Sequence, residues 1–392
     1  ESKNRIQIPF TEDENGTFYG AGFLIDKKRG WILTNAHVAS YSPSEIRVAF
    51  YQQDYIPVKK VYVDPYLDMA IIKFPPEKIP EDAKEASLEC DLSPSMGHPV
   101  GAFGHPWSYS FTGTRGIISG FTAGVEGGML QTDAPINGGN SGGPLISMTT
   151  GKVLGINTSR VDEDSNQNTN FSERIDHICK LLSLIRNRKN PSPPKLEVVF
   201  QKDTIKDTNK LIIAKSYLLA LPLKEGDIIL NVEGLPAPIK NERGLIHALR
   251  GELGNVRLRV LRDGKNVAVV GKLEPREMIT ERKGVFFSGV LISKEWMEDS
   301  VELKLPEFAI HSVEPSSTGR MEGASKYSFV SSVDGKQFKD LGALFEILSK
   351  LKEHGKKAVV KLKSFNEDSS RGYFDYNVIS LDVEDLKYVN GT

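Results

Sequence analysis

The sequence predicts a mainly β chain, in which an all-β sandwich or barrel domain is followed by two small α/β domains. Three observations predict this organisation. Residues 1–185 alternate short apolar runs with turns rich in Gly, Pro and Asn. A polar, proline-rich stretch follows at 186–194, and such a composition cannot build a core. Beyond it, a pattern of strand, helix and two strands occurs twice, with Gly234 and Gly335 about 100 residues apart in equivalent places.

The composition is that of an ordinary globular protein. The chain has 392 residues, enough for about two to four domains, and is 39% apolar and 26% charged. A net charge of −1 gives no long-range attraction to nucleic acid or to an anionic membrane, so we expect neither as a partner. No run of about 18 apolar residues occurs, so we expect no integral membrane segment. Because the chain begins at Glu1 rather than Met, we expect a trimmed N-terminus from which any signal or transit peptide was removed.

The first predicted domain spans residues 1–186 and closes with a helix. Four aliphatic residues recur at helical spacing over 175–185, and Ser172 is placed to cap the start of this helix. A linker is predicted at 187–195. The strands of the domain are expected at Trp31–Leu33, Ile46–Phe50, Val61–Val63, Met69–Phe74, Val100–Phe103, Gly116–Ser119 and Val153–Ile156.

The two later domains are predicted at 196–277 and 284–388. Each combines one strand that ends near a Val-X-Gly turn, one helix and two further strands. In the first copy these elements are expected at 226–234, 243–249, 256–261 and 266–273, with Asp263-Gly264 as the last turn. In the second copy they are expected at 327–335, 341–351, 358–362 and 372–381.

The two cysteines, Cys90 and Cys179, are too few for a disulfide framework and lack the spacing of a metal site. Cys179 lies on the apolar side of the predicted helix, and Cys90 lies in a polar loop. We therefore expect neither a disulfide framework nor a metal site from this pair, and we expect Cys179 to be packed as a small apolar residue.

Residues 139–144 read Gly-Asn-Ser-Gly-Gly-Pro, which is the most informative stretch of the chain. The glycines around Ser141 leave its Oγ uncrowded and let backbone N–H groups point together at a developing oxyanion. A serine is a weak nucleophile by itself, so catalysis requires a base and an orienting carboxylate elsewhere. Without these two groups, Ser141 would be only a turn serine of a β protein.

His37 and Asp68 are the candidates for those two groups. His37 follows the apolar run 31–33, and Asp68 precedes the apolar run 69–72, so both lie at the ends of predicted strands. Asp64, four residues before Asp68, is the alternative carboxylate.

The expected roles follow from elementary chemistry. Near neutral pH the imidazole of His37 can accept the Ser141 proton and later return it to the leaving amine. Asp68 would accept a hydrogen bond from Nδ1–H of His37, fix its tautomer and stabilise the imidazolium. The backbone N–H groups of Gly139 and Ser141 would hold the tetrahedral oxyanion.

The order His, Asp, Ser is that of chymotrypsin-type proteases, and the three blocks resemble those of the HtrA/Deg family of trypsin-like serine proteases. The blocks are Thr34-Asn35-Ala36-His37-Val38, Asp68-Met69-Ala70-Ile71-Ile72-Lys73 and Gly139-Asn140-Ser141-Gly142-Gly143-Pro144-Leu145. The likeness covers roughly residues 15–185. It implies a chymotrypsin-like double β-barrel protease domain, in which Ile156, Asn157 and Thr158 wall the specificity pocket. The segment 170–175 departs from the family pattern, which leaves the shape of that pocket open.

The later repeats resemble PDZ domains, through Leu223–Ile229 with Val232-Glu233-Gly234 in the first copy and Val333-Asp334-Gly335 in the second. PDZ domains capture a C-terminal peptide by adding it to a sheet edge. The segment 284–289 matches the carboxylate-binding loop better than the first copy does, so Val285, Phe286 and Phe287 are the candidate peptide-binding residues. The alternative is that one or both domains only scaffold an assembly.

The resemblance implies an ATP-independent serine endopeptidase that hydrolyses unfolded or damaged proteins through an acyl-enzyme on Ser141, with no metal and no organic cofactor. It also implies a homotrimer or a larger multiple of trimers, and a place in the bacterial periplasm or cell envelope, with plastid or mitochondrion as alternatives.

Two other functions stay open: a chaperone or scaffold with a resting protease domain, and a processing protease that cuts one partner. Phe10, Phe18 and Tyr19 are expected either to contact other subunits of the trimer or to pack in the core. The loop Asp162–Asp164 is expected either to regulate the site or to be simply solvated. His98 and His105 are expected to serve in turns.

Overall fold

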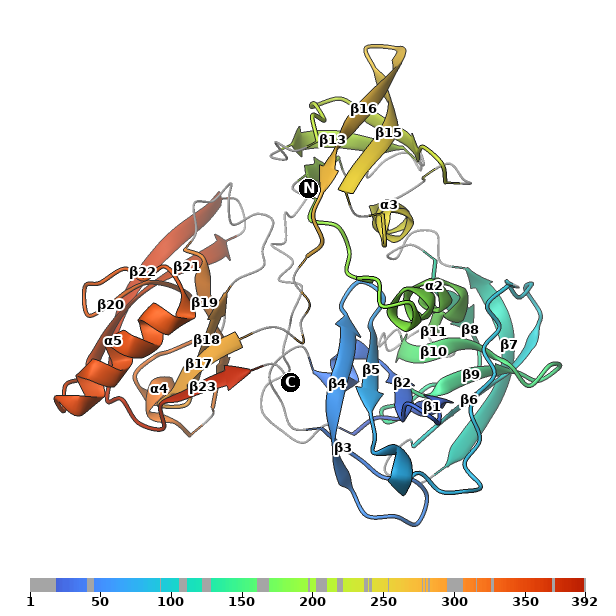
Figure 1. The fold of residues 1–392 in the computed structure, drawn as a ribbon, viewed down its shortest axis with the longest axis horizontal. Coiled ribbons are helices and arrows are strands. Elements are labelled where there is room, and N and C mark those ends of the chain that lie inside the picture. Colours follow the sequence, from blue (N-terminus) through green and yellow to red (C-terminus); the bar gives the residue numbers. More distant parts are fainter. Residues whose placement is uncertain are drawn as a thin grey trace. The chain divides into compact units, whose positions relative to one another are not determined.

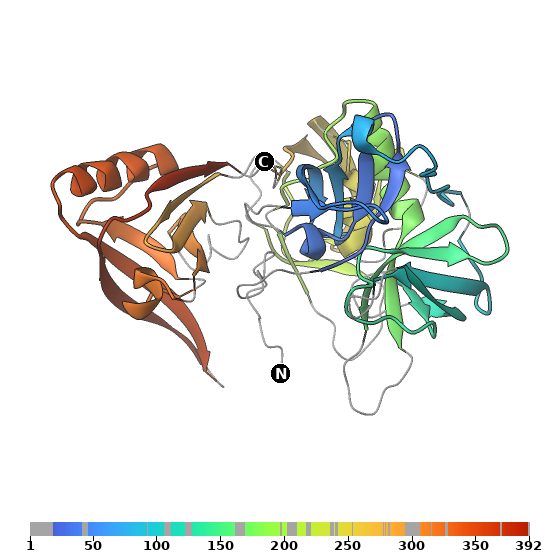
Figure 2. The same cartoon turned by 90° about the horizontal axis from the view of Figure 1, so that it is seen from below.

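The computed structural model describes residues 19–40, 46–91, 93–105, 111–121, 128–160, 169–196, 198–201, 210–216, 221–235, 239, 242–252, 254–276, 278, 280, 283–294, 306–314, 316–325, 328–368 and 371–390. The chain divides into two compact units (Figures 1 and 2). The first holds Tyr19–Ala39 and Ile46–Met278, and the second is built on Ile279–Thr392. Among the described residues, no helix combines the length and the apolar character needed to cross a bilayer.

The first unit begins with a five-stranded antiparallel sheet in the order β1-β2-β5-β4-β3. Strand β2 is buried along its whole length, as the apolar run at 31–33 predicts. Leu33 and Ile71 of this sheet share a core with residues of the helix that closes the predicted protease domain. The bounds are β1 (Phe23–Asp26), β2 (Trp31–Thr34), α1 (Ala36–Ala39), β3 (Ile46–Val48), β4 (Ile56–Asp64), β5 (Met69–Lys73) and the 3-10 helix η1 (Pro76–Lys78).

A closed six-stranded barrel follows in the order β10-β11-β8-β7-β6-β9, drawn from cyan to green in Figure 1. Its interior is packed with aliphatic side chains such as Val100, Ile118 and Leu145. The bounds are β6 (Pro99–Gly104), β7 (Thr112–Phe121), β8 (Leu130–Thr132), β9 (Pro144–Ser147), β10 (Val153–Arg160) and β11 (Asn170–Arg174). The mainly β fold class predicted from the sequence is confirmed.

The helix predicted after the barrel is α2 (Ile175–Arg186), but its predicted cap is wrong. Ser172 lies in β11, because the pairing of β11 with β10 continues as far as Arg174 opposite Gly155. The Ser172 hydroxyl donates instead to Asn157 Oδ1 at 3.2 Å. Arg174 stands at the N-cap position without a side-chain hydrogen bond to the helix.

The remainder of the first unit is a five-stranded sheet with its strands in sequence order, together with helix α3 (Glu242–Leu249). The hairpin predicted around Asp263-Gly264 is present, and both turn residues have positive φ angles, +50° and +74°. The strands are β12 (Val198–Phe200), β13 (Leu211–Ser216), β14 (Ile228–Val232), β15 (Gly254–Arg262) and β16 (Lys265–Leu273).

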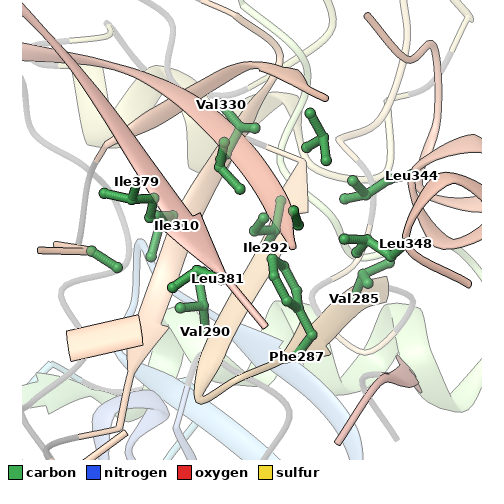
Figure 3. Close-up of a cluster of buried hydrophobic side chains, with 14 of the residues drawn as sticks. Val285, Phe287, Val290, Ile292, Ile310, Val330, Leu344, Leu348, Ile379 and Leu381 are labelled. Carbon is green, nitrogen blue, oxygen red and sulfur yellow. The ribbon is translucent and has the colours of Figure 1, made fainter. Parts of the chain in front are cut away.

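The second unit is a seven-stranded sheet in the order β22-β21-β20-β19-β18-β17-β23, with helices α4 and α5. Leu344 and Leu348 of α5 enter the core beside Val285 of β17 (Figure 3). Helix α5 starts where the sequence predicts, since Asp340 Oδ1 accepts a hydrogen bond from Ala343 N at 2.8 Å. The bounds are β17 (Lys283–Phe287), β18 (Val290–Lys294), β19 (Phe308–Val313), α4 (Thr318–Met321), β20 (Phe329–Val333), α5 (Leu341–Glu353), β21 (Ala358–Asp368), β22 (Arg371–Leu381) and β23 (Lys387–Asn390).

The structure corrects the expectation for the cysteines, because Cys90 and Cys179 form a disulfide with their Cα atoms 5.8 Å apart. The bond joins the segment before β6 to helix α2. Two cysteines 89 residues apart form no local pattern, so only the fold brings them together.

We expect the double variant Cys90→Ser/Cys179→Ser to lower the free energy of unfolding by about 2–4 kcal/mol, since a cross-link over a long loop restricts the unfolded chain. Urea unfolding followed by circular dichroism measures this difference. Wild-type protein kept in reductant serves as the control and should match the variant. If unfolded, unreduced wild-type protein takes up iodoacetamide on both cysteines, no disulfide is present.

Candidate active site

His37 lies in the short helix α1, directly after the buried strand β2. The end of β2 is fixed by Thr34, whose Oγ1 donates to Ala21 O at 2.7 Å. The His37 side chain is 38% exposed, and its Nδ1 lies 2.8 Å from Asp68 Oδ2. The backbone N–H of His37 donates to Asp68 Oδ1 at 3.0 Å. Both oxygens of one carboxylate therefore hold the histidine.

Asp68 stands in the turn between β4 and β5 with a φ of +40°, a left-handed conformation that Asp tolerates better than most residues. Asn35 Nδ2 donates to the Asp68 carbonyl oxygen at 2.8 Å, which ties this turn to the start of α1. The alternative carboxylate, Asp64, is fully buried and forms an ion pair with Arg250. Of the two carboxylates, Asp68 is the one that the structure brings to His37.

Ser141 lies in a turn that backbone hydrogen bonds hold to two other segments. Ala21 N donates to Ser141 O at 2.8 Å, and Gly142 N donates to Asn157 O at 2.9 Å. Gly142 has a φ of +86°, and a Cβ there would lie 2.1 Å from Ala21 O, so only glycine fits. The Ser141 Oγ donates to Thr158 O at 3.2 Å.

Thr158 joins the serine turn to the aspartate. Its Oγ1 donates to Asp68 Oδ2 at 2.5 Å, while its carbonyl oxygen accepts the bond from Ser141. The sequence placed Thr158 only in a pocket wall and missed its contact with Asp68. No local pattern signals a hydrogen bond between residues 90 positions apart.

The other two predicted pocket residues, Ile156 and Asn157, have fully buried side chains. Asn157 Nδ2 donates to Phe103 O at 3.3 Å and to Pro144 O at 3.2 Å, so its amide joins three barrel strands. Neither residue is exposed to solvent in this structure, and their role in a pocket stays a prediction.

Gly139 has a φ of +100°, and its carbonyl oxygen accepts a hydrogen bond from the backbone N of His105 at 3.1 Å. This bond fixes the turn just before Ser141.

The His105 Nδ1 accepts from Phe111 N at 3.1 Å, and burial lowers the pKa of His105 below its ordinary value. His98 Nε2 lies 2.8 Å from Ser147 Oγ. His105 thus has a partner close to it in the sequence, whereas the partner of His98 lies at the end of strand β9.

The remaining expectations from the sequence concern the aromatic residues near the N-terminus and the acidic loop. Phe10, Phe18 and Asp162–Asp164 lie outside the described residues. Tyr19 is described, and its side chain is 66% exposed.

In the second unit, the candidate peptide-binding residues lie in β17. Val285 and Phe287 are fully buried in the core (Figure 3), and Phe286 of the same strand is half-buried. Strand β17 pairs with β18 along one edge and with β23 along the other, where Tyr388 stands opposite Val285. A peptide could add to this strand only in place of one of these neighbours, so peptide binding here stays a prediction.

Comparison with known proteins gives consistent matches. A family model described as a trypsin-like peptidase domain matches residues 20–156, which include His37, Asp68 and Ser141. The chain is 26% identical over 297 residues to the serine protease Do-like HtrA of Bacillus subtilis, a match covering 68% of this chain and 65% of that protein. It is 25% identical over 378 residues to the periplasmic serine endoprotease DegP of Salmonella typhimurium, covering 90% of this chain and 75% of that protein. The match therefore spans just under two thirds of the Bacillus relative.

A solved structure of the HtrA-type protease AlgW with a tripeptide superposes with a TM-score of 0.54 at 24% identity, covering 66% of this chain and 89% of that chain. This likeness supports the fold, and the sequence matches extend beyond the peptidase domain over most of the chain. The chain thus carries a trypsin-like peptidase domain, and over most of its length it is similar to serine proteases of the HtrA/Deg family.

Proposed function

We propose that the chain is a serine endopeptidase that hydrolyses peptide bonds through an acyl-enzyme on Ser141. The observation that carries this proposal is the arrangement around Asp68. Its carboxylate lies 2.8 Å from His37 Nδ1, and Thr158 connects the same carboxylate to Ser141. An imidazole oriented by a carboxylate and a glycine-flanked serine are the two groups that acyl transfer to a hydroxyl requires.

In the proposed reaction, His37 Nε2 takes the proton of Ser141 as Oγ attacks the carbonyl carbon of the scissile peptide. Because Ser141 Oγ donates to Thr158 O in this conformation, it must leave that bond and turn toward His37 before it attacks. The tetrahedral oxyanion would be held by the N–H groups of Gly139 and Ser141. His37 then protonates the leaving amine, and water hydrolyses the acyl-enzyme by the same proton transfers in reverse.

We further propose that the substrates are unfolded or damaged proteins and that the chain acts in protein quality control without ATP. The support is the family of the chain and its relatives among HtrA and DegP proteases, one of which is named as periplasmic. On the same ground we propose a periplasmic or envelope location and assembly as a homotrimer. The domain limits at 1–186, 196–277 and 284–388 belong to this proposal, with the two later domains PDZ-like.

Replacing Ser141 by Ala tests the proposed function. A fluorophosphonate probe should form one adduct on the wild-type chain, and Ser141→Ala should abolish both this adduct and casein cleavage, with a loss of kcat of about 10⁶-fold. Intact-protein mass spectrometry and a gel assay measure the two effects. Wild-type protein that stays unlabelled and inactive with unfolded substrate at raised temperature would refute the proposal. Residual cleavage by the variant would indicate a contaminating protease.

We expect Thr158→Val to lower kcat about 10-fold with little change in KM, because the Asp68 carboxylate loses a charge-assisted hydrogen bond worth about 1.5–3 kcal/mol. Thr158→Ser keeps the hydroxyl and is the matched control, which should retain most of the activity. Steady-state kinetics on a fluorogenic peptide measure both variants. Equal activities of the Val and Ser variants would show that the hydroxyl does not support Asp68.

Peptide capture at β17 gives a separate prediction. Ending the chain after Leu386 removes β23 and exposes the edge residues Lys283–Phe286 that pair with it. We expect this truncation to tighten binding of C-terminal decapeptides about 10-fold or more in fluorescence polarisation, since the edge no longer has to be vacated. Tyr376→Ala, which changes an exposed residue of β22 and leaves β23 in place, is the control. Unchanged affinity would place peptide binding elsewhere.

A further inference from the structure

A fully buried ion pair joins the five-stranded sheet that begins the first unit to the residue that follows helix α3. Arg250 Nη1 lies 2.5 Å from Asp64 Oδ2, and Arg250 Nη2 donates to Asp64 Oδ1 at 2.9 Å. Both side chains are 0% exposed. Asp64 is the last residue of β4, whereas Arg250 belongs to the first PDZ-like domain, so this bidentate pair connects two predicted domains within the first unit.

Asp64 organises the turn that ends in Asp68. Its Oδ1 accepts hydrogen bonds from Tyr66 N at 3.0 Å and from Leu67 N at 2.9 Å. Leu67 is itself buried, and the next residue is Asp68, in its left-handed conformation. The carboxylate of Asp64 therefore sets the path of the backbone just before the residue that holds His37.

The remaining partners make this carboxylate dependent on Arg250. Tyr62 OH donates to Asp64 Oδ2 at 2.6 Å, and Arg250 Nη1 also donates to Pro191 O at 2.8 Å. Burial, followed by the neighbouring Asp64 charge, raises the pKa of Tyr62 well above its ordinary value, so the hydroxyl stays a donor. Without the guanidinium, a buried carboxylate would be left uncompensated, and the turn would have to open to hydrate it.

We infer that Arg250 is a positioning residue for proteolysis, through which the first PDZ-like domain holds the Asp64–Asp68 turn and so aligns Asp68 with His37. The inference rests on the proposed function, because it needs Asp68 to act in catalysis. It assigns to this domain a part in the chemistry of the protease domain, and it makes full activity depend on the docking of the two domains.

The test compares Arg250→Lys with Arg262→Lys in the full chain. Arg262 forms an equally close bidentate pair with Asp227, at 2.7 Å for both bonds, inside the PDZ-like domain and away from the Asp68 turn. For Arg250→Lys we expect kcat per active site, titrated with a fluorophosphonate, to fall about 10-fold or more with KM nearly unchanged. Removing the charge of a triad aspartate costs about 10⁴-fold, which sets the upper limit. For Arg262→Lys we expect kcat per active site to equal that of the wild type.

The pH dependence of kcat/KM separates positioning from a loss of stability. If Asp68 moves away from His37, the imidazolium loses its partner, so the acid limb should shift to lower pH in Arg250→Lys and stay in place in Arg262→Lys. An unchanged acid limb with full kcat per titrated site overturns the inference, even where the melting temperature falls.

Tyr62→Phe supplies a second variant, because it weakens the hold on Asp64 without leaving a charge unpaired. We expect a smaller loss of kcat and a shift of the acid limb in the same direction. If Arg250→Lys does not fold, an unshifted acid limb in Tyr62→Phe overturns the inference. Failure of the proposed function is distinguishable, since wild-type protein would then be neither labelled nor active.

Discussion

The carboxylate of Asp68 is the acceptor on which the candidate site depends. It receives hydrogen bonds from the backbone and the ring of His37 and from the Thr158 hydroxyl, and the carbonyl of Thr158 in turn contacts Ser141. Charge-assisted hydrogen bonds of this kind contribute about 1.5–3 kcal/mol each when partly shielded from water. The left-handed backbone of Asp68 costs about 1–3 kcal/mol, so the surrounding contacts must hold it there. A strained residue that several donors fix is typical of a functional site.

The support for Asp68 extends beyond the protease domain. Burial alone would lower the pKa of Arg250, but the adjacent Asp64 carboxylate and Tyr62 raise it overall, so the guanidinium is the expected charge partner at this depth. Breaking such a pair by removing one partner typically costs about 3–5 kcal/mol. The same interaction therefore stabilises the docking of the first PDZ-like domain and the turn before Asp68. If the first PDZ-like domain undocked while the barrel stayed folded, the turn that carries Ser141 would remain, but Asp68 would lose the support that Asp64 and Arg250 give it.

The sequence predicted the features that short segments of the chain determine, such as single strands, helices, turns and motifs. The pattern of apolar runs gives β2 and the helix at the end of the barrel, and the glycines around Ser141 give a turn that only glycine can form at position 142. The motifs name His37 and Asp68, which the structure places in contact.

The features that sequence reasoning missed are contacts between distant segments. The Thr158–Asp68 hydrogen bond spans 90 residues, the disulfide spans 89, and the Asp64–Arg250 pair spans 186. None of these has a local signal, because each arises from how strands and domains pack. The failed cap at Ser172 has the same cause, since pairing with β10 extends β11 past it.

The disulfide has a mechanical consequence. Cys90 and Cys179 bracket the whole six-stranded barrel, so in the oxidised chain residues 91–178, about 300 Å of extended polypeptide, lie inside a closed covalent loop. A force applied at the two ends of the chain is transmitted across the loop and leaves the barrel strands unstretched. Ser141 lies inside this loop, whereas His37 and Asp68 lie outside it. A pulling force on the oxidised molecule would therefore extend the segment that carries His37 and Asp68, whereas the segment that carries Ser141 would bear no load.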